Sequence, residues 1–390
     1  MHADAAPVLL DRSGRSYPLN ERRWRGDDQG PLTLSPLPGL TPDQIVHAER
    51  SLWRYQAVLP VDLGHRVTLG EGLTPMIPFS WGEHRVHFKL EWFNPTSSFK
   101  DRGVSVMVSH LHSQGADQVL EDSSGNGGAA VAAYAAAAGI RAKIIVPAAT
   151  SAPKILQARA FGAEIELVKG TRDEVGAEAV RQSESIPYAS HNWHPMFVQG
   201  TKTIAYEVWE GLGFTGPDNI VLVAGAGSQI LGCDLAFREL LTAGQIDRLP
   251  RLLVGQPEHW ATIADALNGT DPASRGSRVP TIAEGASIAR PVRLPETVEA
   301  LRRCGGAAVA VPEQQIHDAV RAIAARGLYA EPTSAVAVAA LDHFIAAGTI
   351  TPDQTTVVVL TGSGLKSADK MTTLFSDSSV EAVQRTPTRQ

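Results

Sequence analysis

The sequence predicts an α/β fold of two doubly wound domains, in which parallel sheets carry helices on both faces. Short apolar segments of strand length alternate with segments of helical spacing along most of the 390-residue chain. The strand segments, with Thr356–Leu360 as the clearest, are continuously apolar, as expected for parallel strands buried on both faces. At about 100–200 residues per domain, this length favours two to four domains.

The elements of the first half follow from spacing and from chain-breaking residues. Apolar residues recur at helical spacing between Val104 and Leu111. Pro147 ends one strand, and Gly162 separates a helix from the strand that follows it. We therefore predict strands at Val86–Leu90, Gln118–Leu120, Ala142–Val146 and Ala163–Val168, and helices over Val104–Leu111, Gly127–Ala138 and Pro153–Phe161.

The second half repeats the alternation. The strand Ile220–Ala224 runs into a glycine loop, and Ile316, Val320 and Ile323 mark a helix by their spacing. The other helices expected here are Ile204–Leu212, Ile230–Leu241 and Ser334–Ala347, before the last strand at Thr356–Leu360.

The two ends of the chain lack this alternation. The first 50 residues are polar and interrupted by Pro and Gly, with a basic stretch at Arg12–Arg25 and turn formers at Gly26–Leu40. We predict that residues 1–60 form an irregular N-terminal arm over the core. Ser376–Gln390 has almost no apolar periodicity, which predicts a loose tail over residues 376–390.

Composition excludes several classes of partner. The chain has 35 Lys and Arg against 41 Asp and Glu, and no basic run dense enough for nucleic acid or an anionic membrane. The apolar stretch Gly125–Ile140 is shorter than the roughly 20 residues that span a bilayer. The chain starts without a recognisable targeting signal, and its two cysteines, Cys233 and Cys304, fit a reducing compartment. We expect a cytoplasmic protein without nucleic-acid or membrane partners.

The segment Asn94–Gly103, NPTSSFKDRG, places Lys100 after a strand and a turn, at the start of a helix. One interpretation is a solvated lysine on a helix end. The other is a lysine that forms a Schiff base with a carbonyl at the edge of a sheet. The segment alone does not decide between them.

Two glycine-containing turns precede helices. Asp122–Ala130 combines hydroxyls, Asn126 and glycines, and predicts either an anion site or an ordinary N-cap. Ala224–Gly232 follows a strand, where backbone N–H groups can hold a phosphate. A dinucleotide-binding loop would need glycine at position 230, where this chain has Ile230. The second turn therefore suits a single phosphate, with a tight strand–helix turn as the alternative.

A fourth segment, Leu360–Lys366, ends the last apolar strand and places the hydroxyl of Thr361 at the crevice where α/β proteins bind ligands. A strand-ending turn is again the alternative. Together the segments describe one ligand, with a carbonyl for Lys100, a phosphate for residues 225–228 and a ring with polar edges for Asn126 and Thr361. Pyridoxal 5′-phosphate has these groups.

At this point the chain resembles threonine synthase and its relatives, the fold type II pyridoxal-phosphate enzymes, which have the fold of the tryptophan synthase β subunit. The resemblance implies a large cofactor-binding α/β domain over residues 61–103 and 196–375, a smaller α/β domain inserted at 104–195, and the cofactor in the cleft between them. It also implies a homodimer. The similar stretches are Tyr17–Asn20, Leu52–Tyr55, Leu69–Pro75, Asn94–Gly103, Ser124–Asn126, Gly200–Thr203, the loop at 225–228, Glu331–Ala335 and Thr361–Lys366.

The resemblance also implies roles for single residues. Lys100 corresponds to the catalytic Schiff-base lysine, Asn126 to the partner of the ring hydroxyl and Thr361 to the partner of the pyridine nitrogen. A neutral hydroxyl at that nitrogen suits elimination and replacement more than transamination. The phosphate cradle corresponds to Gly225, Ala226, Gly227 and Ser228, and the substrate carboxylate site to Ser123, Ser124 and Gly127. No metal is implied, because the cysteines that many relatives carry near the N-terminus are absent.

Departures from the family concern the side-chain pocket. Threonine synthases carry an Asn-Pro-Xaa-Arg element that holds the substrate phosphate, and here His194 and Phe197 stand at the asparagine and arginine positions. Gly127 replaces a hydroxyl residue. We therefore predict β- or γ-elimination or replacement on a small amino acid other than O-phosphohomoserine.

Four alternatives to this prediction stay open. Two are enzymes of the same family, a threonine or serine ammonia-lyase and an ordinary threonine synthase. The other two are a nicotinamide oxidoreductase and a catalytically silent relative that only binds a ligand. The missing third glycine and the presence of Lys100 count against the oxidoreductase.

Overall fold

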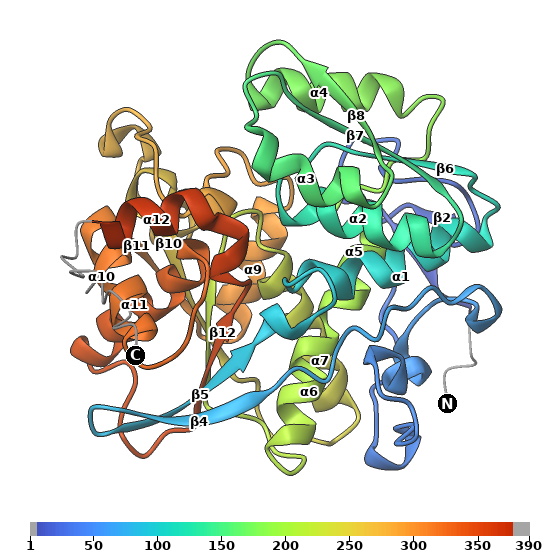
Figure 1. Cartoon of the computed structure of the whole chain (residues 1–390). Helices are drawn as coiled ribbons and strands as arrows, with labels where there is room; N and C mark the ends of the chain where they lie inside the picture. Colours follow the sequence, from blue (N-terminus) through green and yellow to red (C-terminus); the bar gives the residue numbers. More distant parts are fainter. Residues whose placement is uncertain (1–5, 377–390) are drawn as a thin grey trace, which may run out of the picture.

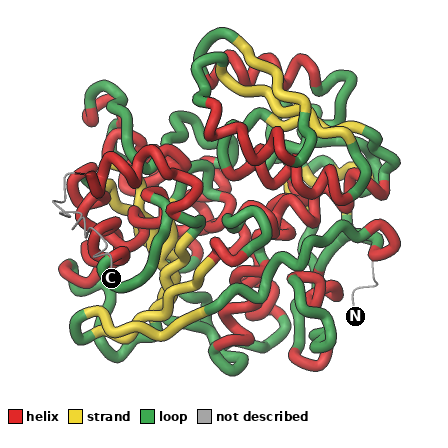
Figure 2. Tube along the Cα trace, in the orientation of Figure 1, coloured by secondary structure: helices red, strands yellow, loops and turns green. Residues whose placement is uncertain are grey.

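The computed structural model describes residues 6–376, which contain one large sheet and two small ones (Figures 1 and 2). The large sheet has the strand order β11-β10-β9-β12-β5-β4. Its strands pair in parallel, except that β4 runs antiparallel to β5 at one edge. The bounds are β4 Met76–Trp81, β5 His84–Leu90, β9 Asn219–Val223, β10 Arg251–Pro257, β11 Ala307–Val311 and β12 Thr356–Leu360.

Both faces of the large sheet are covered by helices. Alternate residues of one strand enter different cores, because successive side chains of a strand point to opposite faces. Val221 and Val358 pack with the core that contains α10 and α11, whereas Ile220 and Val357 pack with the core that contains α6 and α7. The helices of this part are α5 Pro195–Thr201, α6 Thr203–Gly211, α7 Ser228–Thr242, α8 Thr262–Asn268, α9 Leu294–Arg303, α10 Glu313–Ala324, α11 Pro332–Ala346 and α12 Ala368–Ser376.

A second α/β layer lies at the top of Figure 1. Its three strands, β6 Gln118–Glu121, β7 Arg141–Pro147 and β8 Glu164–Val168, are all parallel. Helix α4 (Arg172–Gln182) packs its Val175 against one face, and α2 (Asn126–Ala137) covers the other, with α3 (Ala152–Ala160) beside α2. This sheet lies inside the range 104–195 expected for the smaller domain. The domain boundaries themselves stay a prediction.

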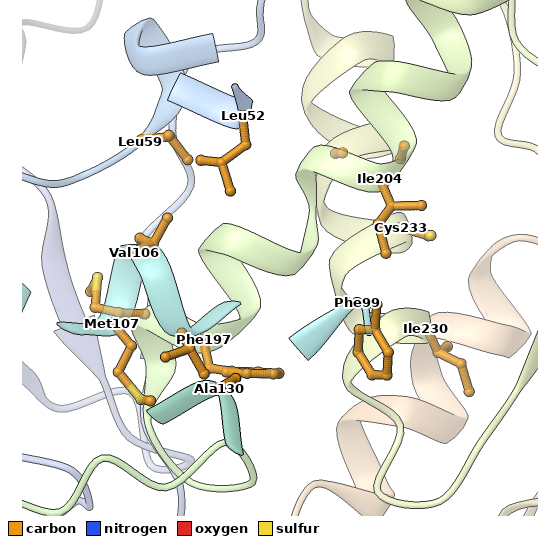
Figure 3. Packing of buried hydrophobic residues seen from close by; sticks show 14 of the residues in the cluster. Leu52, Leu59, Phe99, Val106, Met107, Ala130, Phe197, Ile204, Ile230 and Cys233 are labelled. Carbon is orange, nitrogen blue, oxygen red and sulfur yellow. The ribbon is translucent and has the colours of Figure 1, made fainter. Parts of the chain in front are cut away.

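The two α/β layers share a continuous core through α1 (Lys100–Ser113) and α5. Figure 3 shows Phe197 of α5 with Met107 of α1 and Ala130 of α2 in this core. The helices approach closely because two glycines leave room. A Cβ on Gly103 would lie 2.4 Å from the Phe197 ring, and a Cβ on Gly200 would lie 2.0 Å from the carbonyl oxygen of Arg102.

The N-terminal arm is more deeply packed than the sequence predicts. Residues 6–34 form a small sheet of β1 (Val8–Leu10), β2 (Ser16–Pro18) and β3 (Thr33–Leu34). In the short helical segment Leu52–Val58, Trp53 and Tyr55 are fully buried in the main core. Strands of two or three residues are too short to show a period of two, which explains why the sequence does not reveal them. Residues 377–390 of the expected tail lie outside the described residues.

No helix within residues 6–376 is long and apolar enough to cross a membrane.

A buried charge network holds the start of α1. The Arg102 guanidinium, fully buried, donates to Glu91 at 2.6 and 2.9 Å and to Glu207 at 2.6 and 2.7 Å. The ammonium of Lys89 on β5 donates to the same Glu207 at 2.7 Å. Burial opposes ionisation of Glu207, yet the charges of Arg102 and Lys89 lower its pKa to about 2. The network therefore joins β5, α1 and α6 through ionised groups.

Arg102→Met should destabilise the protein by about 3–5 kcal/mol, because it leaves buried carboxylates without their main counter-charge. Urea unfolding followed by circular dichroism measures the loss. Arg141→Met is the matched control, since the side chains of Arg141 and its partner Asp117 are 68% and 87% exposed. Such an exposed pair contributes at most about 1 kcal/mol. Equal losses in both variants would contradict the importance of the buried network.

Candidate active site

Three predicted site segments lie at the carboxyl ends of neighbouring parallel strands. Residues 225–228 follow β9, Thr361 follows β12, and Lys100 follows β5 after the short helical turn Glu91–Phe93. Backbone hydrogen bonds join two of them, because the Phe99 N–H donates to the Thr361 carbonyl at 2.9 Å. Strand order alone therefore brings Lys100, the glycine loop and Thr361 to one edge of the sheet.

The Lys100 side chain is enclosed by rings. Its ammonium nitrogen lies 4.5 Å from the ring centroid of Phe99 and 5.5 Å from that of Phe197. No hydrogen bond or ion pair joins it to another residue of the described chain. Burial lowers its pKa to about 8, although the carboxyl groups of Glu121 and Glu331 act in the opposite direction. An appreciable fraction of Lys100 is therefore a neutral amine near neutral pH.

The loop Gly225–Ser228 leads into the N-terminus of the long helix α7. Within residues 6–376, the backbone N–H groups of Gly225, Ala226 and Gly227 have no hydrogen-bond partner. Gly227 has a φ of 90°, and a Cβ there would lie 2.6 Å from the hydroxyl oxygen of Thr297. Unpaired N–H groups at a helix N-terminus are a ready site for a phosphate.

Asn126, at the start of α2, and Thr361, just after β12, meet at one carboxylate. The Asn126 amide donates to Glu331 at 3.0 Å, and the Thr361 hydroxyl donates to Glu331 at 2.8 Å. The Ser334 hydroxyl lies 2.9 Å from that of Thr361. Burial raises the pKa of Glu331. Sequence reasoning assigned Glu331 and Ser334 no role, although both lie in the Glu331–Ala335 stretch that resembles the family.

The predicted carboxylate site is the turn that opens α2. A Cβ on Gly127 would lie 3.1 Å from the hydroxyl oxygen of Ser123, so these two positions are adjacent. Ser123 and Ser124 are half-buried. The Ser124 side chain has no hydrogen-bond partner in the described chain. The turn that contains Ser123 and Ser124 leads directly into the first turn of α2, which begins at Asn126. An anion can be bound at such a helix start.

The two residues of the predicted side-chain pocket have different surroundings. Phe197 is fully buried, packs on Gly103 and lies beside the ammonium of Lys100. His194 is also buried, and its Nδ1 accepts from the backbone N–H of Met196 at 3.3 Å, which caps α5. Burial lowers the pKa of His194, as its role as a neutral acceptor requires. No hydrogen bond or ring contact joins His194 to Lys100 within residues 6–376.

Arg293, just before α9, is a residue that sequence reasoning missed. It is buried, and its side chain makes a single hydrogen bond, to the carbonyl of Trp193 at 2.6 Å. No carboxylate of the described residues pairs with it. Burial lowers its pKa to about 10, so it stays charged at neutral pH. Only the fold brings Arg293 next to Trp193 and His194, because about 100 residues separate them in sequence.

The residues at this edge fit pyridoxal 5′-phosphate. An unpaired amine at Lys100 suits its aldehyde, and the free N–H groups at residues 225–227 suit its phosphate. Asn126 and Thr361 supply polar contacts for a ring. Among residues 6–376, no group of three or more His, Cys, Asp and Glu side chains is arranged to hold a metal ion.

Sequence comparison points to the same cofactor. The model of the family "Pyridoxal-phosphate dependent enzyme" matches residues 67–362. The chain is 33% identical to a threonine synthase of Methanocaldococcus jannaschii over 332 residues, which is 82% of each chain. It is 35% identical to a threonine synthase of Mycobacterium leprae over 324 residues, covering 81% of this chain and 88% of the relative.

Solved structures share the fold. The processed form of threonine deaminase isoform 2 from Solanum lycopersicum superimposes with a TM-score of 0.67 and 23% identity, covering 87% of this chain and 90% of that one. Maize serine racemase gives a TM-score of 0.64 and 22% identity, covering 78% and 92%. The predicted fold class, family resemblance and cofactor are thereby confirmed, and the chain belongs to the pyridoxal-phosphate dependent enzyme family.

Proposed function

We propose that this protein is a lyase or side-chain replacement enzyme that acts on a small amino acid whose side-chain substituent is uncharged. The observation that carries the proposal is the position of Lys100, a buried amine with a lowered pKa at the sheet edge, with the donor-free ring of Phe197 beside it. Serine, threonine and O-acetylserine are substrates of this kind. Elimination from a hydroxy amino acid is the variant that we favour.

The proposed roles follow from the contacts of each residue. Lys100 binds the cofactor covalently, the N–H groups of Gly225–Ser228 hold its phosphate, and Asn126 and Thr361 contact its ring. Ser123, Ser124 and Gly127 receive the substrate carboxylate at the start of α2. Pyridoxal 5′-phosphate supplies an electron sink for the bonds at the substrate α-carbon. The neutral amine of Lys100, once released, removes the proton from that carbon.

Phe197 is the reason to exclude O-phosphohomoserine. The phosphate of that substrate is best held by an arginine, whose two N–H groups match two phosphate oxygens. Phe197 offers no donor at the position where family members have that arginine. His194 is already used as the cap of α5.

A second candidate, an ordinary threonine synthase, is favoured by Arg293. This buried cation has no carboxylate partner in the described chain and lies beside Trp193. It is available to hold an anionic substituent in place of the arginine that Phe197 replaces. The support from the relatives is that the matched proteins are named threonine synthases.

A substrate panel separates the two candidates. We expect serine, threonine or O-acetylserine to be turned over with at least about a tenfold higher kcat/KM than O-phosphoserine and O-phosphohomoserine, because one missing charged hydrogen bond costs roughly 1.5–3 kcal/mol. Keto acid release and amino acid analysis identify the products. Threonine formed preferentially from O-phosphohomoserine, and abolished by Arg293→Gln, would establish the second candidate instead.

Lys100 should set the pH dependence of cofactor binding. The neutral amine is the reactive form, so the rate at which cofactor-free protein binds pyridoxal 5′-phosphate should rise with pH up to about 8 and then level off. For an exposed lysine the rise would continue to about pH 10. Absorbance in a stopped-flow instrument follows the reaction.

Borohydride reduces the bond between a lysine and the cofactor aldehyde to a stable adduct that mass spectrometry can locate. Lys100→Ala should lose this adduct, and the exposed control Lys169→Ala should keep it. An adduct that persists in Lys100→Ala would refute this assignment.

We also propose a homodimer located in the cytoplasm. The support for the dimer is the family resemblance, and the support for the location is a chain with two cysteines, both buried and unpaired. Light scattering coupled to size-exclusion chromatography tests the dimer, for which the expected mass is twice the 41.5 kDa of one chain.

A further inference from the structure

A histidine–carboxylate pair lies beside the candidate active site and has no role in the functions proposed above. Glu121 is the last residue of β6 and is fully buried. The Nδ1 atom of His191 lies 2.6 Å from a carboxylate oxygen of Glu121. The imidazole is thus held at one nitrogen, while its Nε2 has no hydrogen-bond partner within residues 6–376.

His191 borders the space next to Lys100. A Cβ on Gly127 would lie 2.7 Å from Nδ1 and 2.9 Å from Cε1 of His191, so the ring rests on the start of α2. The ring centroids of His191 and Phe197 are 5.8 Å apart, and the same Phe197 ring lies 5.5 Å from the Lys100 ammonium. The His191 side chain is 10% exposed, whereas the Glu121 side chain that holds it is fully buried.

This contact explains why glycine stands at position 127. Any side chain there would collide with the His191 ring. The hydroxyl that the family resemblance leads one to expect at this position is absent, and an imidazole occupies the adjacent space. Gly127 and His191 therefore form one unit, in which a nitrogen donor stands beside the predicted carboxylate site.

We propose that His191 is a catalytic acid that protonates the departing hydroxyl group of the substrate, with Glu121 as the positioning residue that resupplies the proton. The proposal rests on the proposed function, elimination from a hydroxy amino acid. Hydroxide is a poor leaving group, so its departure requires a proton donor. Lys100 cannot supply that proton at the outset, because its neutral amine is needed to accept the proton of the α-carbon.

The step balances within the pair. The C–O bond at the substrate β-carbon breaks with its electrons on oxygen, and the oxygen takes the proton from Nε2 of His191, so that water leaves. Nδ1 then takes the proton of the Glu121 carboxyl group, which becomes a carboxylate. Solvent returns one proton to the pair before the next turnover, and Lys100 releases to solvent the one that it removed.

The surroundings favour a protonated Glu121 at neutral pH. Burial raises the pKa of Glu121 to about 8, against the charges of Arg172 and Lys100, and burial lowers the pKa of His191. The other ionisable groups that act on the pair are Asp122 and Tyr188. A protonated Glu121 donates to Nδ1, which leaves the proton of a neutral imidazole on Nε2. Above about pH 8 the pair loses its proton and Nε2 stops being a donor.

The test compares two leaving groups on the same enzyme. Chloride leaves without a proton, so β-chloroalanine elimination does not need an acid, whereas serine elimination does. His191→Asn and Glu121→Gln should each lower kcat for serine at least about 100-fold and change kcat for β-chloroalanine less than about 3-fold.

The pH dependence of the wild-type protein gives a further test. The kcat for serine divided by the kcat for β-chloroalanine should fall as the pH rises through about 8, because the pair then loses its proton. The ionisation of Lys100 affects both substrates alike and therefore cancels in this ratio.

A second readout needs no turnover. Above about pH 8, where Nε2 has lost its proton and carries a lone pair, diethyl pyrocarbonate should modify Nε2 of His191 in the cofactor-free protein, and peptide mass spectrometry locates the adduct. The control His343→Gln changes an exposed histidine on α11 and should leave both kcat values unchanged. Thermal unfolding of each variant shows whether it is folded.

The outcomes separate the two proposals. Equal losses of kcat on serine and β-chloroalanine in a folded His191→Asn variant would overturn the role of His191 and leave the proposed function intact. A pH-independent ratio of kcat values, or a His191 that does not react with the reagent above about pH 8, would also overturn it. A wild-type enzyme that eliminates from neither substrate would refute the proposed function, and this inference with it.

Discussion

The position of the Lys100 amine depends on a guanidinium two residues further along the chain. Arg102 is locked between Glu91 and Glu207, and neither carboxylate can move without leaving a charge unpaired in the core. The network fixes the first turn of α1 against β5 and α6. The backbone bond from Phe99 to Thr361 then fixes the other side of Lys100. The backbone at Lys100 is thus fixed on both sides, so the buried side chain that it carries always starts from the same place in the site.

The site is completed by an interface between the two α/β layers. Thr361 follows strand β12 of the large sheet and Asn126 opens helix α2 on the small one, and the carboxylate of Glu331 accepts from both. Their relative positions depend on the packing of α1 against α5. Gly103 and Gly200 let those helices approach within a distance that any Cβ would prevent. The two layers therefore share a core, and the packing of α1 against α5 next to Lys100 sets the relative positions of Asn126 and Thr361.

Site residues that directly follow a strand can be predicted from the sequence. Site residues that meet only across the cleft cannot. Lys100, the loop at 225–228 and Thr361 each come after an apolar segment, so strand order alone predicts their convergence. Arg293 and Trp193, or His191 and Glu121, meet only in the folded chain, and no local pattern marks them. Elements with weak periodicity also escape prediction. Strand β10 carries Gly255 and Gln256 within its apolar run, and β11 is a short Ala and Val segment.

The contact between Gly127 and His191 also sets the order in which such a site can be assembled by mutation. A relative that carries a side chain at position 127 has no room for histidine at position 191, because the His191 ring lies 2.7 Å from where a Cβ on residue 127 would stand. The glycine has to come first and leaves a gap beside the substrate carboxylate, and the histidine then fills it. Laboratory conversion of a relative should therefore fail through the histidine-first intermediate and proceed through the glycine-first one.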